Sequence, residues 1–119
     1  MKTDPNHRVF GMMWGKLHAV YVTKVERKGR DRADLDRVLG WLTGRSPTAL
    51  DEAVASDMTL RDFFETAPAM NPAREKVTGV ICGVRIEEID HPLMKEIRIL
   101  DKLVDELAKG RAMEKILRA

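Results

Sequence analysis

The last third of the chain carries one long amphipathic pattern, which constrains the fold more than any other feature. Apolar residues recur every three or four positions, at Leu93, Ile97, Leu100, Leu103, Val104 and Leu107, and then at Met113, Ile116 and Leu117. The charged residues that alternate with this stripe include Glu96, Asp101, Lys102, Asp105 and Glu106. This spacing predicts a helix from Pro92 whose apolar face lies on a core and whose charged face lies in solvent.

Local start signals mark several further helices. Proline follows Ser46, Asn71 and His91, and proline suits the first helical position because its missing N–H would have no partner there. The side chains of Ser46 and Asn71 can also accept hydrogen bonds from free amides. Asp31 and Thr59 each stand three residues before an aspartate, a spacing that resembles a capping box. Each of these positions is therefore a predicted helix start.

Stop signals complete the helix boundaries. Gly29, Gly44 and Gly110 each follow a periodic stretch, where the left-handed position after a helix favours glycine. Together with the apolar spacing, these signals predict helices over residues 8–28, 31–43, 47–56, 59–67, 72–89 and 92–117, the last breaking at Gly110. We predict a mainly α fold, a compact bundle of five to six short helices in a single domain over residues 8–119. Residues 1–7 are predicted to be flexible.

The segment from Val77 to Ile89 fits two interpretations. Alternating apolar residues at Val80, Cys82, Val84 and Ile86 are typical of a strand. A helix would instead place Val77, Val80, Ile81 and Val84 on one face. We favour the helix because Asn71-Pro72 opens it and no second strong strand is available for pairing. Val20–Thr23 is a weaker strand candidate, and pairing of the two segments would give a minor β element.

Composition restricts the classes of function. The chain has 119 residues and a net charge of +2, so no strong overall field favours nucleic acid. A single cysteine, Cys82, cannot form an intramolecular disulfide, which favours a reducing compartment. The chain shows neither a signal peptide nor an apolar run long enough to span a bilayer. We therefore expect a cytoplasmic protein without membrane contact.

No motif for a metal, a phosphate loop or a catalytic set is evident, and we predict no metal and no cofactor. His7, His18 and His91 lack the spacing of a helical metal pair, and we expect His18 to be packed or hydrogen-bonded. Cys82 lies among apolar neighbours, so we interpret it as a buried structural cysteine.

Two sets of residues are candidates for binding. The first combines Trp41 with Arg85, Glu87 and Glu88, because these lie in the densest polar and aromatic blocks. The second is a basic stretch containing Lys24, Arg27, Lys28 and Arg30, which could hold phosphate or another anion. A solvated helix end explains the basic stretch more simply.

Five blocks of the sequence resemble one protein family. They are ERKGR at residues 26–30, WLTG at 41–44, TGVICGVRIEEI at 78–89, DKLVDELAKG at 101–110 and MEKIL at 113–117. In this order they resemble a bacterial family known as domain of unknown function 2200. The resemblance implies a compact, mainly α-helical cytosolic domain, and with it a helix over residues 72–89. It implies no activity and transfers no catalytic residue.

The leading hypothesis from the sequence is a small binding or assembly module, either homo-oligomeric or with a protein partner. It rests on long amphipathic stripes that could pack between chains and on the lack of a catalytic set. The alternative is an enzyme or small-ligand-binding protein with a site assembled around Trp41, Arg85, Glu87 and Glu88. Binding of nucleic acid or phosphate through residues 24–32 is a weaker alternative.

Overall fold

The computed structural model describes residues 7–118 and contains six α-helices among them. The α-helices are α1 (Trp14–Arg27), α2 (Arg32–Thr43), α3 (Pro47–Ala55), α4 (Leu60–Glu65), α5 (Pro92–Ala108) and α6 (Met113–Ile116). Three short 3₁₀ helices are η1 (Arg8–Gly11), η2 (Pro72–Lys76) and η3 (Ile86–Glu88). Two strands, β1 (Val80–Ile81) and β2 (Val84–Arg85), form an antiparallel hairpin. The predicted mainly α fold is confirmed.

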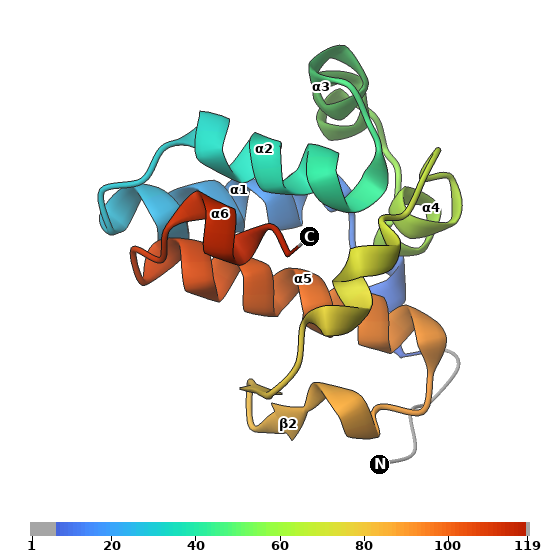
Figure 1. The fold of residues 1–119 in the computed structure, drawn as a ribbon. Coiled ribbons are helices and arrows are strands. Elements are labelled where there is room, and N and C mark those ends of the chain that lie inside the picture. Colours follow the sequence, from blue (N-terminus) through green and yellow to red (C-terminus); the bar gives the residue numbers. More distant parts are fainter. Residues whose placement is uncertain (1–6, 119) are drawn as a thin grey trace.

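The helices α1, α2 and α5 pack against one another and form the centre of the fold (Figure 1). Helix α3 packs on α1 and α2, and α4 packs on η1 and α5. The largest fully buried side chains come from η3 and from all the α-helices except α3: Trp14, Phe63, Leu35, Leu39, Leu42, Leu60, Ile86, Ile99, Leu100, Leu103, Leu107 and Ile116. No helix of residues 7–118 combines the length and the apolar character needed to cross a bilayer.

Most predicted helix ends agree with the structure. The side chains of Asp31, Ser46 and Thr59 each accept an amide hydrogen bond at a helix start, and Thr59 and Asp62 form a complete capping box. Gly44 and Gly110 follow helix ends with φ angles of 78° and 83°. These signals were readable because each acts within three or four residues of the helix end.

The predicted helix over residues 8–28 is interrupted. Met12 and Met13 are extended, and Met13 forms an isolated β-bridge with Thr59. The N–H of Trp14 donates to the carbonyl of Met58 at 2.8 Å, and the N–H of Leu60 donates to the carbonyl of Met12 at 2.8 Å. These bonds tie the start of α1 to the start of α4, a partner far away in sequence. Val20 and Thr23, the weaker strand candidate, lie within α1.

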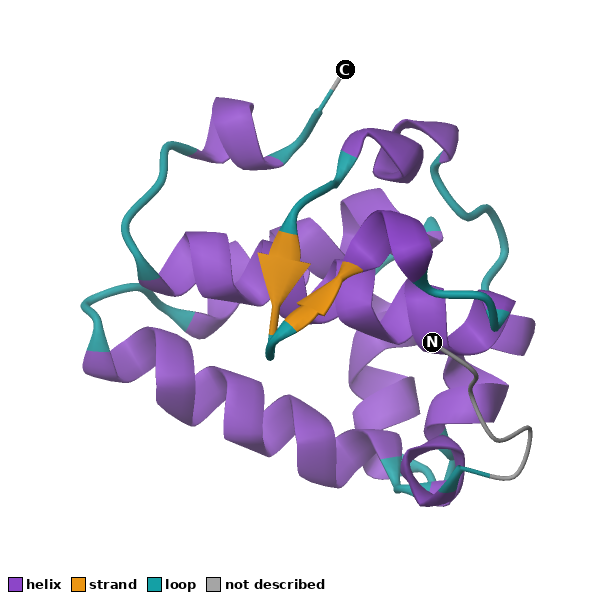
Figure 2. Ribbon diagram, turned by 90° about the horizontal axis from the view of Figure 1, so that it is seen from below, coloured by secondary structure: helices purple, strands orange, loops and turns teal. Residues whose placement is uncertain are grey.

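The predicted helix over residues 72–89 is wrong, and the alternative strand interpretation describes its centre. Asn71 and Pro72 open a 3₁₀ helix of five residues, and the chain then forms the β1–β2 hairpin and η3. The hairpin, whose strands are orange in Figure 2, lies against α5. Lys102 of α5 donates to the carbonyl of Val80. The partner of β1 is therefore β2, which begins after a loop of only two residues.

The hairpin follows from the backbone conformation of two residues. Cys82 and Gly83 form the two-residue loop between Ile81 and Val84, with φ angles of 52° and 74°. A loop with positive φ at both central positions matches the right-handed twist of the flanking strands, and glycine accepts that conformation at no steric cost. Cysteine is a poor residue at the first of these positions, because its Cβ crowds the backbone there.

Replacing Cys82 with asparagine is expected to raise the free energy of unfolding by about 0.5–1 kcal/mol, because asparagine tolerates positive φ better. Urea denaturation followed by far-UV circular dichroism measures the change. Cys82→Ala is the matched control, since it removes the thiol but keeps a Cβ at φ 52°. An equal gain from alanine would contradict the backbone explanation.

The C-terminal helix breaks where predicted, but one prediction about its charged face is wrong. After Gly110 the chain turns back, and α6 packs on α5 with Ile116 fully buried. Glu106, expected in solvent, is only 7% exposed. Its carboxylate accepts hydrogen bonds from Arg118 and Arg111. The segment after Gly110 therefore covers part of the face that the helical pattern assigned to solvent.

Candidate functional site

One hollow in the described residues lies beside Trp41 on α2. We call it the Trp41 pocket; it has a volume of about 480 Å³ and is lined mainly by apolar atoms. Its walls come from α2, the following loop and α3, through Ala33, Asp36, Arg37, Gly40, Trp41, Arg45, Pro47 and Leu50. Trp41 is partly buried, because one part of its ring packs on the core while another lines the pocket.

Two charged residues of the Trp41 pocket differ in their partners, since Asp36 is paired whereas Arg37 has no ion pair with a described residue. The carboxylate of Asp36 contacts Nε2 of the buried His18 at 3.1 Å and Nε of Arg32 at 3.2 Å. The expectation that His18 is packed and hydrogen-bonded is confirmed. Arg37 is exposed and forms no ion pair with any residue of 7–118. The pocket thus offers a flat aromatic wall beside an arginine that is available to a ligand.

A second hollow, of about 440 Å³, lies on the other side of α3 and is called the Thr66 pocket. Its lining includes Arg45, Glu52, Ser56, Met58 and Thr66. Arg45 lines both pockets, and its side chain is 92% shielded from solvent, with 8% exposed. Burial lowers the pKa of Arg45 from its ordinary value. A buried cation therefore stands at the junction of the two hollows.

Nearly the whole chain matches a known protein family and a solved structure. A family model described as "Uncharacterized protein conserved in bacteria (DUF2200)" matches residues 8–118. The chain belongs to the DUF2200 family. The crystal structure of uncharacterized protein SP1917 is similar to this DUF2200 chain, with 45% identity and a TM-score of 0.88. The match covers 92% of this chain and 90% of that one. No curated protein matches the chain.

The structure of this DUF2200 chain does not bring the predicted residues Trp41, Arg85, Glu87 and Glu88 into one pocket. Trp41 lines a pocket built from α2 and α3, whereas the other three lie in β2 and η3, in the hairpin segment that packs on α5. Glu87 accepts the N–H of Gly79 at 2.6 Å, and this bond lowers the pKa of its carboxyl. Glu87 therefore holds the hairpin together. Binding at Trp41 stays a prediction, and the hairpin residues are not part of its pocket.

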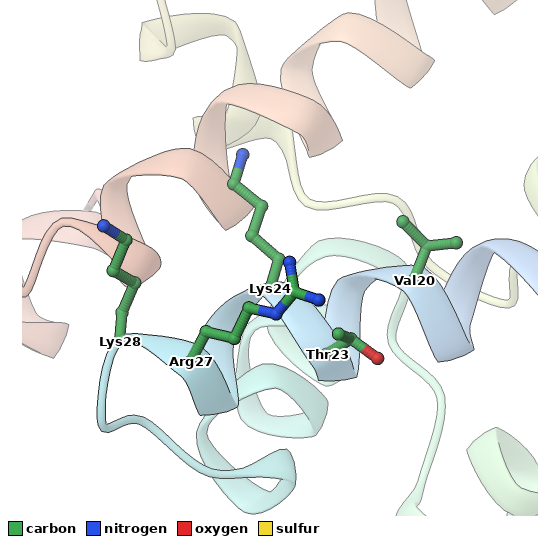
Figure 3. A pocket seen from close by; sticks show the side chains of 5 residues that line it. All are labelled: Val20, Thr23, Lys24, Arg27 and Lys28. Carbon is green, nitrogen blue, oxygen red and sulfur yellow. The ribbon is translucent and has the colours of Figure 1, made fainter.

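The predicted basic site is only partly assembled. Lys24, Arg27 and Lys28 line a shallow hollow on α1 with Val20 and Thr23 (Figure 3). Lys24 pairs with Asp105 of α5 at 3.5 Å, whereas Arg27 and Lys28 have no ion pair with any described residue. Arg30 turns away, toward Asp34 and the carbonyl of Arg111. Arg27 and Lys28 are exposed and no described residue holds them in place, which is typical of a solvated helix end. Anion binding there stays a prediction.

Cys82 is exposed at the hairpin tip, so the interpretation of a buried cysteine is wrong. Its place in the turn, rather than its apolar neighbours, decides its exposure.

Within residues 7–118 no group of three or more His, Cys, Asp and Glu side chains is arranged to hold a metal ion. Below the hairpin tip, Tyr21 donates to Asp101 at 2.5 Å, and burial, followed by the charge of Asp101, raises the pKa of the phenol well above 10.

Sequence reasoning missed Arg45 and Thr66, the polar residues that the fold brings to the Thr66 pocket. They are 21 positions apart, and Nη2 of Arg45 donates to Oγ1 of Thr66 at 2.9 Å. One available signal was the position of Arg45 directly after Gly44, where the helix ends and the helical pattern no longer predicts the direction of a side chain. The sequence contains no signal that this side chain turns inward onto α4.

Proposed function

We propose that this DUF2200 chain is a small binding module whose Trp41 pocket accepts a flat apolar group of a small ligand. The observation that carries the proposal is the partial burial of Trp41 against a pocket of about 480 Å³. Small-molecule sites commonly have volumes of about 300–1,000 Å³ and mostly apolar walls with few polar groups. Arg37 and Asp36 supply the polar groups at the rim.

The case for an assembly role is weaker than the sequence suggested. The stripes that motivated a homo-oligomer or a protein partner, including Ile97, Leu100, Leu103 and Leu107, are buried within this chain. They are therefore not available for packing between chains. We also propose a cytoplasmic location, which the exposed single thiol of Cys82 supports, because such a thiol persists in a reducing compartment.

Uncharged aromatic fragments test the binding proposal. Titration of the ¹⁵N-labelled chain with indole or benzyl alcohol is expected to give saturable NMR shifts at Ala33, Gly40 and the Trp41 indole N–H. Trp41→Ala is expected to weaken this binding about tenfold, because it removes the stacking face and its apolar area. Trp41→Phe, the matched control, keeps a flat ring and is expected to bind with only a modest loss.

Two results would contradict the proposal. The first is a set of saturable shifts that map to residues outside the Trp41 pocket. The second is equal affinity in the wild-type chain and in a folded Trp41→Ala variant. Far-UV circular dichroism establishes that each variant is folded.

A further inference from the structure

The Thr66 pocket contains a buried positive charge that no acid among residues 7–118 neutralises. Arg45 is 8% exposed and forms no ion pair with any carboxylate of residues 7–118. Its Nη1 is shielded from solvent and has no hydrogen-bond partner in that range. A buried charge without a partner is costly, and arginines in proteins are usually paired when buried. The fold therefore places a cation in a position where a bound anion would stabilise it.

The guanidinium of Arg45 is held rigidly. Its Cζ lies 4.2 Å from the centre of the Phe63 ring, and the Trp14 ring stacks on Phe63 at 3.8 Å. Both distances are too short for the two groups to share one face of the ring, so Phe63 lies between Trp14 and Arg45. The bond from Nη2 to Thr66 holds the edge of the guanidinium. A cation stacked on an aromatic ring keeps its in-plane N–H groups for other partners.

Arg45 and Thr66 both line the Thr66 pocket. Thr66 is exposed and its hydroxyl already donates to the carbonyl of Asp62 at 2.6 Å, so it acts as an acceptor for Arg45. Each terminal guanidinium nitrogen carries two hydrogens, and the bond to Thr66 uses only one of those on Nη2. An anion beside Thr66 can therefore pair with the arginine without displacing any described hydrogen bond.

Glu52 decides how strongly the pocket would attract an anion. It is exposed and lines the same pocket, yet it makes no ion pair with Arg45 or with any other residue of 7–118. Its carboxylate therefore leaves the arginine uncompensated and instead opposes an incoming negative charge. The pocket combines one buried cation, held by Phe63 and Thr66, with one exposed acid at its wall.

From these contacts we propose that the Thr66 pocket binds an oxyanion, a carboxylate or phosphate group, which pairs with Arg45 beside Thr66. The Thr66 pocket shares Arg45 with the wall of the Trp41 pocket but lies on the other side of α3, and neither proposal depends on the other. Guanidinium groups form paired hydrogen bonds with both kinds of oxyanion. Because the guanidinium is already ordered by Phe63 and Thr66, binding need not order this side chain.

NMR titration of the ¹⁵N-labelled full chain with sodium acetate and, separately, with sodium phosphate tests the site. Ionic strength is held constant with sodium chloride. Saturable shifts are expected at the amides of Arg45, Ser56 and Thr66 with at least one of the two anions, and the stronger response identifies the class of oxyanion. Equal shifts in chloride alone, or no saturable shift with either oxyanion, would overturn the proposal.

Two variants assign the response to the buried charge. Arg45→Met keeps an unbranched apolar stem on Phe63 and is expected to weaken binding at least about tenfold, since it removes a charge-assisted hydrogen bond. Glu52→Gln, on the exposed wall, is expected to tighten binding about threefold by removing the opposing charge. If Arg45→Met does not fold, Glu52→Gln still decides, because unchanged or weaker binding in that variant overturns the proposal.

Discussion

Replacing Trp14 with alanine is expected to lower the free energy of unfolding by about 3–5 kcal/mol, as for other large buried aromatics. Trp14 is 0% exposed at the start of α1, and its ring stacks on Phe63 of α4 at 3.8 Å. It also lies edge-on to Tyr21 at 6.4 Å and near His18 at 5.8 Å. Since domains of this size are typically stable by about 5–15 kcal/mol, the loss is a large part of the total.

The substitution also lies where backbone hydrogen bonds join α1 to the start of α4, so the cavity would weaken this junction. The N–H of Trp14 donates to Met58, and the adjacent Met13 forms the bridge to Thr59. An alanine would leave a cavity between α1 and α4 at the point where these bonds join the two helices. Urea denaturation followed by far-UV circular dichroism measures the loss of stability.

Trp14→Phe is the matched control for the alanine variant. It keeps an aromatic face on Phe63 and removes the indole Nε1–H, which is buried without a hydrogen-bond partner in the described residues. Its expected loss is about half that of alanine or less, because the smaller ring leaves a smaller cavity. A loss below about 1 kcal/mol for Trp14→Ala would contradict the central place assigned to this residue.

Replacing Glu106 with glutamine is expected to cost about 3 kcal/mol and to loosen the C-terminal segment selectively. Its Oε1 and Oε2 accept hydrogen bonds from Arg118 at 2.6 and 2.8 Å, and Arg111 donates to Oε2 at 2.9 Å. The side chain of Arg118 is only 16% exposed. Glutamine has nearly the same shape but no charge, so two arginines would remain beside each other without an acid.

Hydrogen exchange and urea denaturation together measure the effect of Glu106→Gln. The amides of α6 are expected to lose protection more than those of α1 or α2, because Glu106 is the acid that holds the segment after Gly110. Glu114→Gln is the matched control, since this exposed residue of α6 forms no ion pair with a described residue. Its expected loss is within about 0.5 kcal/mol. Equal losses in the two variants would show that Glu106 does not anchor α6.

The candidate site shows how far a single sequence reaches. Trp41 was selected because it lies in a dense polar and aromatic block, and it does border a hollow, whereas its role in binding stays a prediction. Its proposed companions Arg85, Glu87 and Glu88 were chosen by density along the chain, and they lie in the hairpin instead. Arg45, a true neighbour, was passed over, although it is only four residues after Trp41.

By itself the sequence determined the mainly α class, the family and most helix ends. The side chains of Asp31, Ser46 and Thr59 accept hydrogen bonds from amides three residues further along the chain, so the information for these helix starts is local. The apolar stripe of α5 likewise predicted its buried face, because helical periodicity places those residues together before any tertiary contact forms.

Only the tertiary structure decided what lies opposite each helical face. Glu106 became buried because α6 folds back over α5. Arg45 became a buried cation because its side chain reaches Phe63 of α4 and Thr66, the residue that follows this helix. The hairpin at residues 80–85 formed because the turn at Cys82 and Gly83 allows two short strands to pair and to pack on α5. These outcomes depend on partners brought together by the whole fold, and a pattern along one segment carries no information about them.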